Sequence, residues 1–66
     1  MSDHDKLRER LALLKAEHRD LDDAILSLAQ RAVPDMLQLA RVKKRKLQIR
    51  DEISRVENQL LPDIIA

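Results

Sequence analysis

A single proline divides an otherwise continuous heptad pattern, and this combination constrains the fold more than any other feature. Before Pro34, the positions at alternating intervals of four and three are Leu7, Leu11, Leu14, His18, Leu21, Ile25, Leu28 and Ala32. After it, the same rhythm continues through Leu39, Val42, Lys46, Ile49, Ile53, Val56 and Leu60. Such spacing places one stripe on a helix face and is typical of helices that pack along a coiled-coil seam.

The two prolines set the limits of the expected helices. Proline costs about 3 kcal/mol in a helix interior but is tolerated in a first turn. Ser2 with Asp5 can cap a first helix, and Asp35 favours a new start after Pro34. Pro62 disfavours helical geometry at the residue before it. The sequence therefore predicts a single all-α domain over residues 1–66, with helices at about 4–31 and 35–60, a turn at about 32–34 and a tail at 61–66.

Folding the chain at residues 33–34 brings the two stripes into register. Each a position then meets a d position, as in antiparallel coiled coils. The expected layers are Leu28–Leu39, Ile25–Val42, Leu14–Ile53, Leu11–Val56 and Leu7–Leu60. This alignment predicts an antiparallel, coiled-coil-like two-helix hairpin.

A continuous helix is the alternative, because the heptad pattern passes Pro34 without a change of phase. Such a helix would be about 90 Å long and would pair with a second chain. In a parallel pair, His18 and Lys46 would each meet their own copies, and an antiparallel pair would make the hairpin contacts between chains. The cost of an internal proline favours the hairpin.

Composition removes several classes of function. The chain has no cysteine, glycine or aromatic residue, which excludes disulfides, thiolate metal sites, glycine-rich phosphate loops and aromatic stacking platforms. No histidine base accompanies the serines on the expected helices, and two helices cannot enclose a dry pocket. We therefore expect no enzyme, and no catalytic, cofactor-binding or metal-binding residue.

The N-terminal segment is polar where a secretory signal would be apolar, and no apolar run approaches the ~20 residues of a membrane span. The net charge of +1 is too balanced to imply a nucleic-acid or membrane partner by itself. A cytoplasmic protein without membrane contact is expected.

Two segments resemble the YdcH-type small bacterial proteins, a family with a domain of unknown function. The first carries E-H-x-x-L-D-x-x-I from Glu17 to Ile25, and the second carries K-K-x-K-L-x-(I/L)-(R/K)-D-E-I from Lys43 to Ile53. The resemblance covers about residues 7–56. It implies a self-associating helical hairpin and assigns no catalytic or ligand-binding residue. The tight Ala-Val-Pro-Asp connection departs from the longer polar linker of other members.

His18 and Lys46 are the polar residues of the otherwise apolar seam. One hypothesis makes them a ligand or proton site together with Glu17 and Asp22. The other, which we favour, makes them specificity residues that fix register and partner number at a cost in stability. On that hypothesis, a protonated His18 beside Lys46 would weaken the assembly below about pH 6.

A basic run lies in the second helix and comprises Arg41, Lys43, Lys44, Arg45, Lys46 and Arg50. One hypothesis is a face that contacts nucleic-acid phosphates. The favoured one is that nearby carboxylates neutralise much of its charge, namely Glu17, Asp20, Asp22 and Asp23. The ideal register gives the flanking contacts Asp22–Lys43 and Arg8–Glu57, and two between like charges, Glu17–Glu52 and Lys15–Arg50.

Six large apolar residues between the seam positions would stay exposed on a lone hairpin: Leu13, Leu26, Met36, Leu37, Leu47 and Leu61. A core of this size is marginal, and two hairpins packed as a four-helix bundle could cover part of them. We therefore expect a homodimer. The apolar tail after Leu60 either covers the open end of the hairpin near Leu7 or joins the two chains of the dimer, which we favour, or docks on another protein.

These features favour a small non-enzymatic protein–protein interaction or assembly module that acts through helix–helix contacts, with itself or an unidentified protein as partner. The alternative is a nucleic-acid-binding accessory protein that uses the basic face from Arg41 to Arg50.

Overall fold

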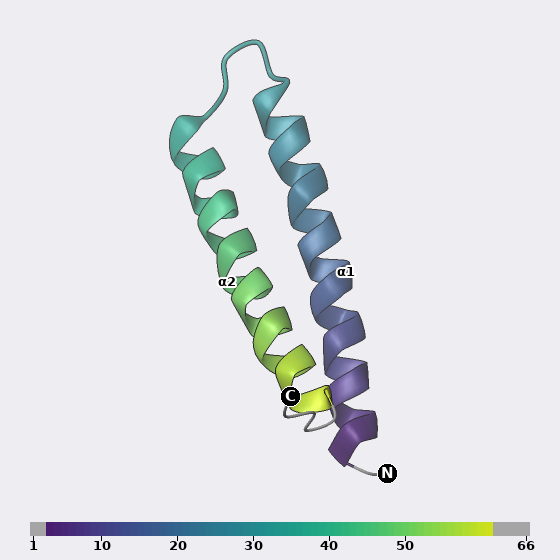
Figure 1. Cartoon of the computed structure of the whole chain (residues 1–66). Helices are drawn as coiled ribbons and strands as arrows, with labels where there is room; N and C mark the ends of the chain where they lie inside the picture. The colour runs from purple at the N-terminus through teal and green to yellow at the C-terminus, as the bar shows by residue number, and fades with distance from the viewer. Residues whose placement is uncertain (1–2, 62–66) are drawn as a thin grey trace.

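The computed structural model describes residues 3–61, which form two helices side by side in opposite directions (Figure 1). Helix α1 spans Asp3–Ala29 and helix α2 spans Met36–Leu60. The longest dimension is 49 Å, about half the roughly 90 Å of an unbroken helix. The predicted all-α hairpin is therefore confirmed. The expected cap at Ser2 and residues 62–66 of the tail lie outside the described residues.

The connection between the helices is longer than predicted. Helix α1 ends at Ala29 rather than near residue 31, because Val33 precedes the proline and is disfavoured in helical backbone geometry. At the last turn the Arg31 N–H donates to the Leu28 carbonyl at 3.4 Å, a tightening from the α-helical to the 3₁₀ pattern. Ala32, which the heptad pattern placed in the seam, is consequently exposed.

Asp35 begins the second helix, as its position beside the proline predicted. Its Oδ1 accepts a hydrogen bond from the backbone N–H of Gln38 at 3.1 Å, an N-cap that contributes about 1 kcal/mol. At the other end, Leu61 has extended backbone geometry, and its N–H donates to the Glu57 carbonyl at 3.0 Å. Helix α2 is thus bounded at both ends by residues that leave the helical conformation.

Every buried hydrophobic side chain among the described residues belongs to the predicted seam: Leu14, Leu28, Leu39, Ile49 and Val56. Ile49 is fully buried and forms a cluster with Leu14 and Val56. Half-buried seam residues pack around this cluster, namely Leu7, Leu11, Leu21, Ile53 and Leu60. The cluster joins the first half of α1 to the second half of α2, as the predicted register requires.

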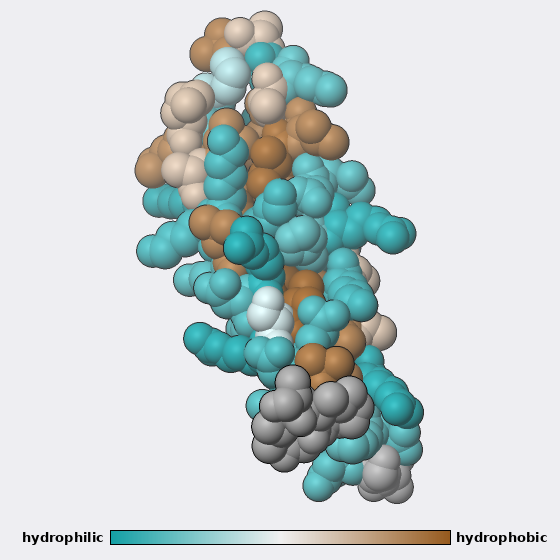
Figure 2. Space-filling view, viewed as in Figure 1, coloured by the Kyte–Doolittle hydropathy of each residue, from teal (hydrophilic) through white to brown (hydrophobic). Residues whose placement is uncertain are grey.

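Outside the seam, large apolar side chains remain exposed: Leu13, Leu26, Val33, Met36, Leu37, Leu47 and Leu61. All but Val33, which lies in the turn, are the residues that the heptad pattern placed outside the seam. Figure 2 shows hydrophobic residues at the turn end and along the middle of one face, among hydrophilic ones. Neither helix within residues 3–61 is long and apolar enough to cross a membrane.

Candidate interaction surface

Lys46 and His18, the polar residues of the seam, both turn toward one carboxylate. The Lys46 Nζ lies 2.5 Å from Asp22 Oδ1, and the His18 Nδ1 lies 3.9 Å from Oδ2 of the same carboxylate. A lysine can keep its alkyl stem against apolar atoms while its ammonium stays at the surface. Asp22, which one of the two hypotheses grouped with these residues, contacts both of them, whereas Glu17, which it also named, bonds to Arg45.

The hydrogen bond from Lys46 holds the pKa of the Asp22 carboxyl below its ordinary value of 3.8. Desolvation opposes this shift, while the charges of Lys46 and His18 add to it. Asp22 is consequently ionised at neutral pH, and a protonated His18 would gain a countercharge as well as a like-charged neighbour. The predicted weakening of the assembly below about pH 6 thus stays a prediction, with Asp22 opposing it.

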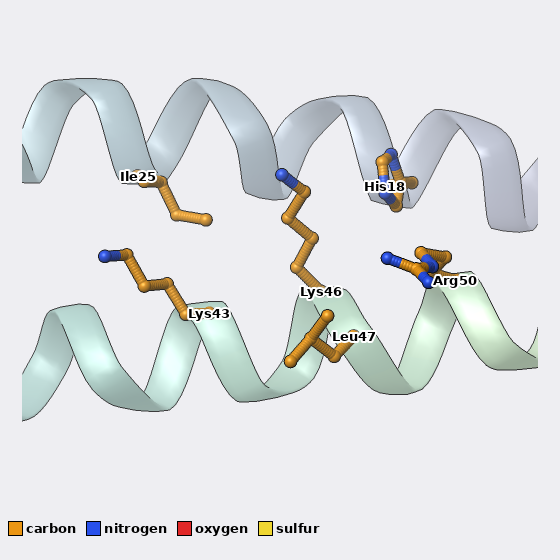
Figure 3. Close-up of a pocket in the computed structure, with 6 residues that line it drawn as sticks. All are labelled: His18, Ile25, Lys43, Lys46, Leu47 and Arg50. Carbon is orange, nitrogen blue, oxygen red and sulfur yellow. The ribbon is translucent and has the colours of Figure 1, made fainter.

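A groove of about 420 Å³ opens beside the contact of Lys46 with Asp22. It is lined by His18, Ile25, Lys43, Lys46, Leu47 and Arg50 (Figure 3). Ile25 of α1 and Leu47 of α2 supply its apolar walls. Figure 3 shows Lys43 and Arg50 on either side of Lys46 along α2. Because the Lys46 ammonium turns toward Asp22, the seam is not filled at this level. We call the surface around these six residues the open side.

The opposite flank of the seam is closed by ion pairs between the helices. Arg45 donates to Glu17 Oε1 from Nη2 at 3.0 Å and from Nε at 3.3 Å. Arg10 Nη2 donates to Glu52 Oε2 at 3.3 Å. Since each residue turns an α-helix by about 100°, residues 45 and 52 lie across the seam from residues 43 and 50. We call the flank with these four residues the paired side.

On the open side, Lys43 and Arg50 have no carboxylate partner within the described residues. The carboxylates that flank the seam there are already in use: Asp22 bonds to Lys46, and Glu57 Oε2 lies 4.0 Å from Lys15 Nζ. The groove is therefore bordered by cations whose charge the hairpin does not balance.

The predicted basic face is divided around α2. Arg45 belongs to the paired side, whereas Lys43 and Arg50 belong to the open side. Arg41 and Lys44 are exposed at other angles of the helix. A run of neighbouring residues cannot share one face at about 100° per residue, so the run is spread around the helix instead of gathered on one face.

The ion pairs also differ from those of the ideal register. Glu17 and Glu52, which that register set near each other, each bond to an arginine instead. The expected Asp22–Lys43 contact is wrong, because Lys46 reaches Asp22. Long side chains extend about one helical turn along the partner helix, which heptad positions do not fix. The expected Arg8–Glu57 contact is also wrong, since Arg8 lies 3.9 Å from Asp5 and Glu57 lies 4.0 Å from Lys15.

The two flanks of α2 differ in apolar content as well. The paired flank reads Gln38, Arg41, Arg45, Gln48, Glu52, Arg55 and Gln59, with one large apolar residue, Leu37, at the same angle of the helix as Arg55. The open flank reads Met36, Ala40, Lys43, Leu47, Arg50, Ser54, Glu57 and Leu61. The sequence prediction identified Met36 and Leu47 as exposed but missed that they share a flank with the unbalanced cations. Their spacing at alternating steps of four and three is the signal that would have shown it.

The described residues contain no group of three or more histidine, cysteine, aspartate or glutamate side chains that could hold a metal ion. The contact of His18 with Asp22 supplies two such groups. Within residues 3–61, no buried side-chain nitrogen or oxygen lacks a hydrogen-bond partner. Among the surface hollows of the described residues, the groove of the open side is the one that combines the apolar walls Ile25 and Leu47 with the cations Lys43 and Arg50.

Comparison with known proteins gives one match. A family model described as "Protein of unknown function (DUF465)" matches residues 11–57, which include His18, Asp22, Lys46 and the other residues that line the groove of the open side. No curated protein and no solved structure matches the chain. The family match agrees with the resemblance to YdcH-type proteins found in the sequence.

Proposed function

Since the chain belongs to the DUF465 family, whose function is unknown, we propose its role from its surfaces: it is a non-enzymatic module for helix–helix contacts. The open side is the contact surface, and a second copy of the chain is a partner that completes a four-helix bundle. The seven exposed large apolar side chains of a two-helix core support this proposal. Bundles of four helices bury such residues on facing helices.

The difference between the flanks of α2 carries the proposal. Leu47 and Met36, 54% and 68% exposed, lie on the open flank, and Leu26 of α1 follows its seam residue Ile25 toward the same side. Among the described residues, the paired flank of α2 offers one large apolar side chain, Leu37 near the turn, whereas the open flank offers Met36, Leu47 and Leu61. A helix that approaches the open side can therefore bury apolar surface, at about 25 cal/mol per Å².

Sedimentation equilibrium of the full chain, with the Leu47→Glu variant, tests self-association. Leu13→Glu is the matched control, because Leu13 is 73% exposed but lies toward the paired side. We expect the wild type and Leu13→Glu to associate, and Leu47→Glu to associate at least about tenfold more weakly, since burying one leucine contributes about 1.5–3 kcal/mol. A wild type that stays monomeric at millimolar concentration would refute self-association.

Nucleic-acid binding is the second candidate, because four cations of the basic run have no carboxylate partner among the described residues: Arg41, Lys43, Lys44 and Arg50. Two carboxylates expected to neutralise the run, Asp20 and Asp23, form no ion pair with α2 in the same set. These cations are available to phosphates.

A gel-shift titration of duplex DNA and RNA across salt concentrations separates the two candidates. Phosphate contact predicts binding at physiological salt with a steep salt slope, lost in Lys43→Glu/Lys44→Glu. Binding that is absent at low salt removes the second candidate and leaves the first untouched.

A further inference from the structure

The charges of the open side select its partner. Resting on the proposed function, we infer that the preferred occupant of the groove is an acidic amphipathic helix of a different protein, with carboxylates placed on either side of an apolar residue. A second copy of the chain is the weaker occupant.

The groove presents two kinds of contact in a fixed order along α2. Lys43 and Arg50 stand seven residues apart, about 10 Å along the helix, and Leu47 lies between them. Ile25 forms the facing apolar wall from α1. A third helix in this groove would place a leucine or isoleucine against Ile25 and Leu47. Its carboxylates, at i and i+7 around that residue, would meet Lys43 and Arg50.

Lys43 and Arg50 need a countercharge from outside the hairpin if the groove is covered. Covering a cation removes water from it, which is unfavourable without a paired anion. Asp22, the carboxylate that the ideal register set beside Lys43, already receives the Lys46 ammonium and faces His18. An approaching helix with carboxylates supplies the countercharge for Lys43 and Arg50 that Asp22 cannot.

A second copy of the chain cannot supply these carboxylates from its own open side. There, Asp22 and Glu57 are the carboxylates that flank the seam, and each already has a cationic partner. Two open sides face to face would set Lys43 and Arg50 of one copy against cations of the other. Self-association would be stabilised by apolar contact and opposed by repulsion between like charges. Binding of an acidic helix would be stabilised both by apolar contact and by attraction between opposite charges.

The two occupants therefore respond to salt in opposite ways. Salt screens attraction and repulsion alike. Self-association of the wild type should strengthen as sodium chloride rises from 50 to 500 mM, on the order of threefold or more. Binding of an acidic helix should weaken over the same range.

Two synthetic peptides test the inference on the full chain. Both share one helical apolar pattern with a tryptophan; one carries glutamate and the other lysine at the flanking positions. Because the protein has no aromatic residue, the peptide tryptophan alone reports binding by fluorescence anisotropy. We expect the glutamate peptide to bind the wild type at least about tenfold more tightly than the lysine peptide.

Charge reversal locates the site. Lys43→Glu/Arg50→Glu should reverse the preference between the peptides, whereas Arg41→Glu/Lys44→Glu, with the same change of net charge on the same helix, should keep it. Far-UV circular dichroism verifies that each variant remains helical. Lys43→Gln/Arg50→Gln, which removes the charges without reversing them, should bind the two peptides alike.

Each other outcome overturns the inference. Equal binding of both peptides to the wild type means that the groove is apolar only, and an equal effect of both reversals means that net charge alone attracts the peptide. Duplex nucleic acid that binds through Lys43 and Arg50 while the glutamate peptide does not makes the groove a phosphate site. Loss of self-association in Leu47→Glu, together with equal peptide binding, would keep the proposed function and remove only this inference.

Discussion

The two flanks of the same seam are built to different ends. On the paired side, Arg45 meets Glu17 and Arg10 meets Glu52, so the charges beside the seam are matched between the helices. Farther from the seam on this flank, Arg41 and Arg55 form no ion pair among the described residues. On the open side, Lys46 turns out of the seam toward Asp22, and Lys43 and Arg50 beside the seam are left without a carboxylate partner there. The first flank closes the hairpin, and in our proposal the second receives a further helix. The comparison shows that a hairpin can pack its two helices against each other and still leave cations without partners on one flank.

The seam beneath both flanks gives the largest expected effect. Ile49→Ala should destabilise the protein by about 2–5 kcal/mol, because it leaves a cavity at a fully buried position. In dilute protein, Leu47→Ala should change the free energy of unfolding by no more than about 0.5 kcal/mol, since the side chain is half exposed. Urea unfolding followed by circular dichroism measures both. A large loss of stability in Leu47→Ala, measured in monomeric protein, would mean that Leu47 supports the fold of the hairpin itself.

Filling the seam at the open side is the next largest change. Lys46→Leu should raise the free energy of unfolding by about 1 kcal/mol, because an apolar side chain replaces a seam ion pair. The control Arg45→Leu, on the paired side, should lower it, because Glu17 loses its partner. Thermal unfolding of the two variants gives the comparison. Destabilisation by Lys46→Leu would mean that the contact with Asp22 outweighs the gap in the seam.

The paired side should show a measurable coupling between its charges. A double-mutant cycle of Glu17→Gln and Arg45→Gln should give about 0.2–1 kcal/mol, the range for exposed ion pairs, and the coupling should fall as salt is added. Both side chains are about half exposed. A coupling energy of zero at low salt would mean that the contact between Glu17 and Arg45 does not stabilise the hairpin.

The smallest effect concerns pH. Because the pKa of the Asp22 carboxyl is lowered in the folded protein, its contribution to stability is fully present above the ordinary value of 3.8. The contribution is lost as the pH falls through the lower, folded value. Wild type and Asp22→Asn should therefore differ in stability at pH 5 and converge as the pH falls below about 3.8. A difference that persists unchanged well below pH 3.8 contradicts the role of Lys46.

The fold followed from the sequence because its determinants are periodic or local. Heptad spacing fixed which side chains are buried, and Asp35 beside the proline fixed the start of α2. The end of α1 was predicted too late, because the proline restricts the backbone at Val33 but does not fix how many residues the reversal of the chain needs. The ion pairs were predicted less well, since arginine and lysine side chains span a full turn and select among several carboxylates.

The sequence predicted only part of the candidate surface. His18 and Lys46 stood out as polar residues of the seam, but Asp22 as their common partner depends on rotamers that spacing does not determine. The groove itself arises from the direction in which Lys46 leaves the seam. Whether such a lysine turns to one flank or the other is decided by which flank offers an unoccupied carboxylate.

The hairpin sets both ends of its described chain at one end of the molecule, opposite the turn (Figure 1). Leu47 lies fourteen residues before Leu61, or about 20 Å along the helix. A segment joined to either end would therefore attach to the hairpin at the end opposite the turn. The groove, farther along α2, would remain accessible to a partner.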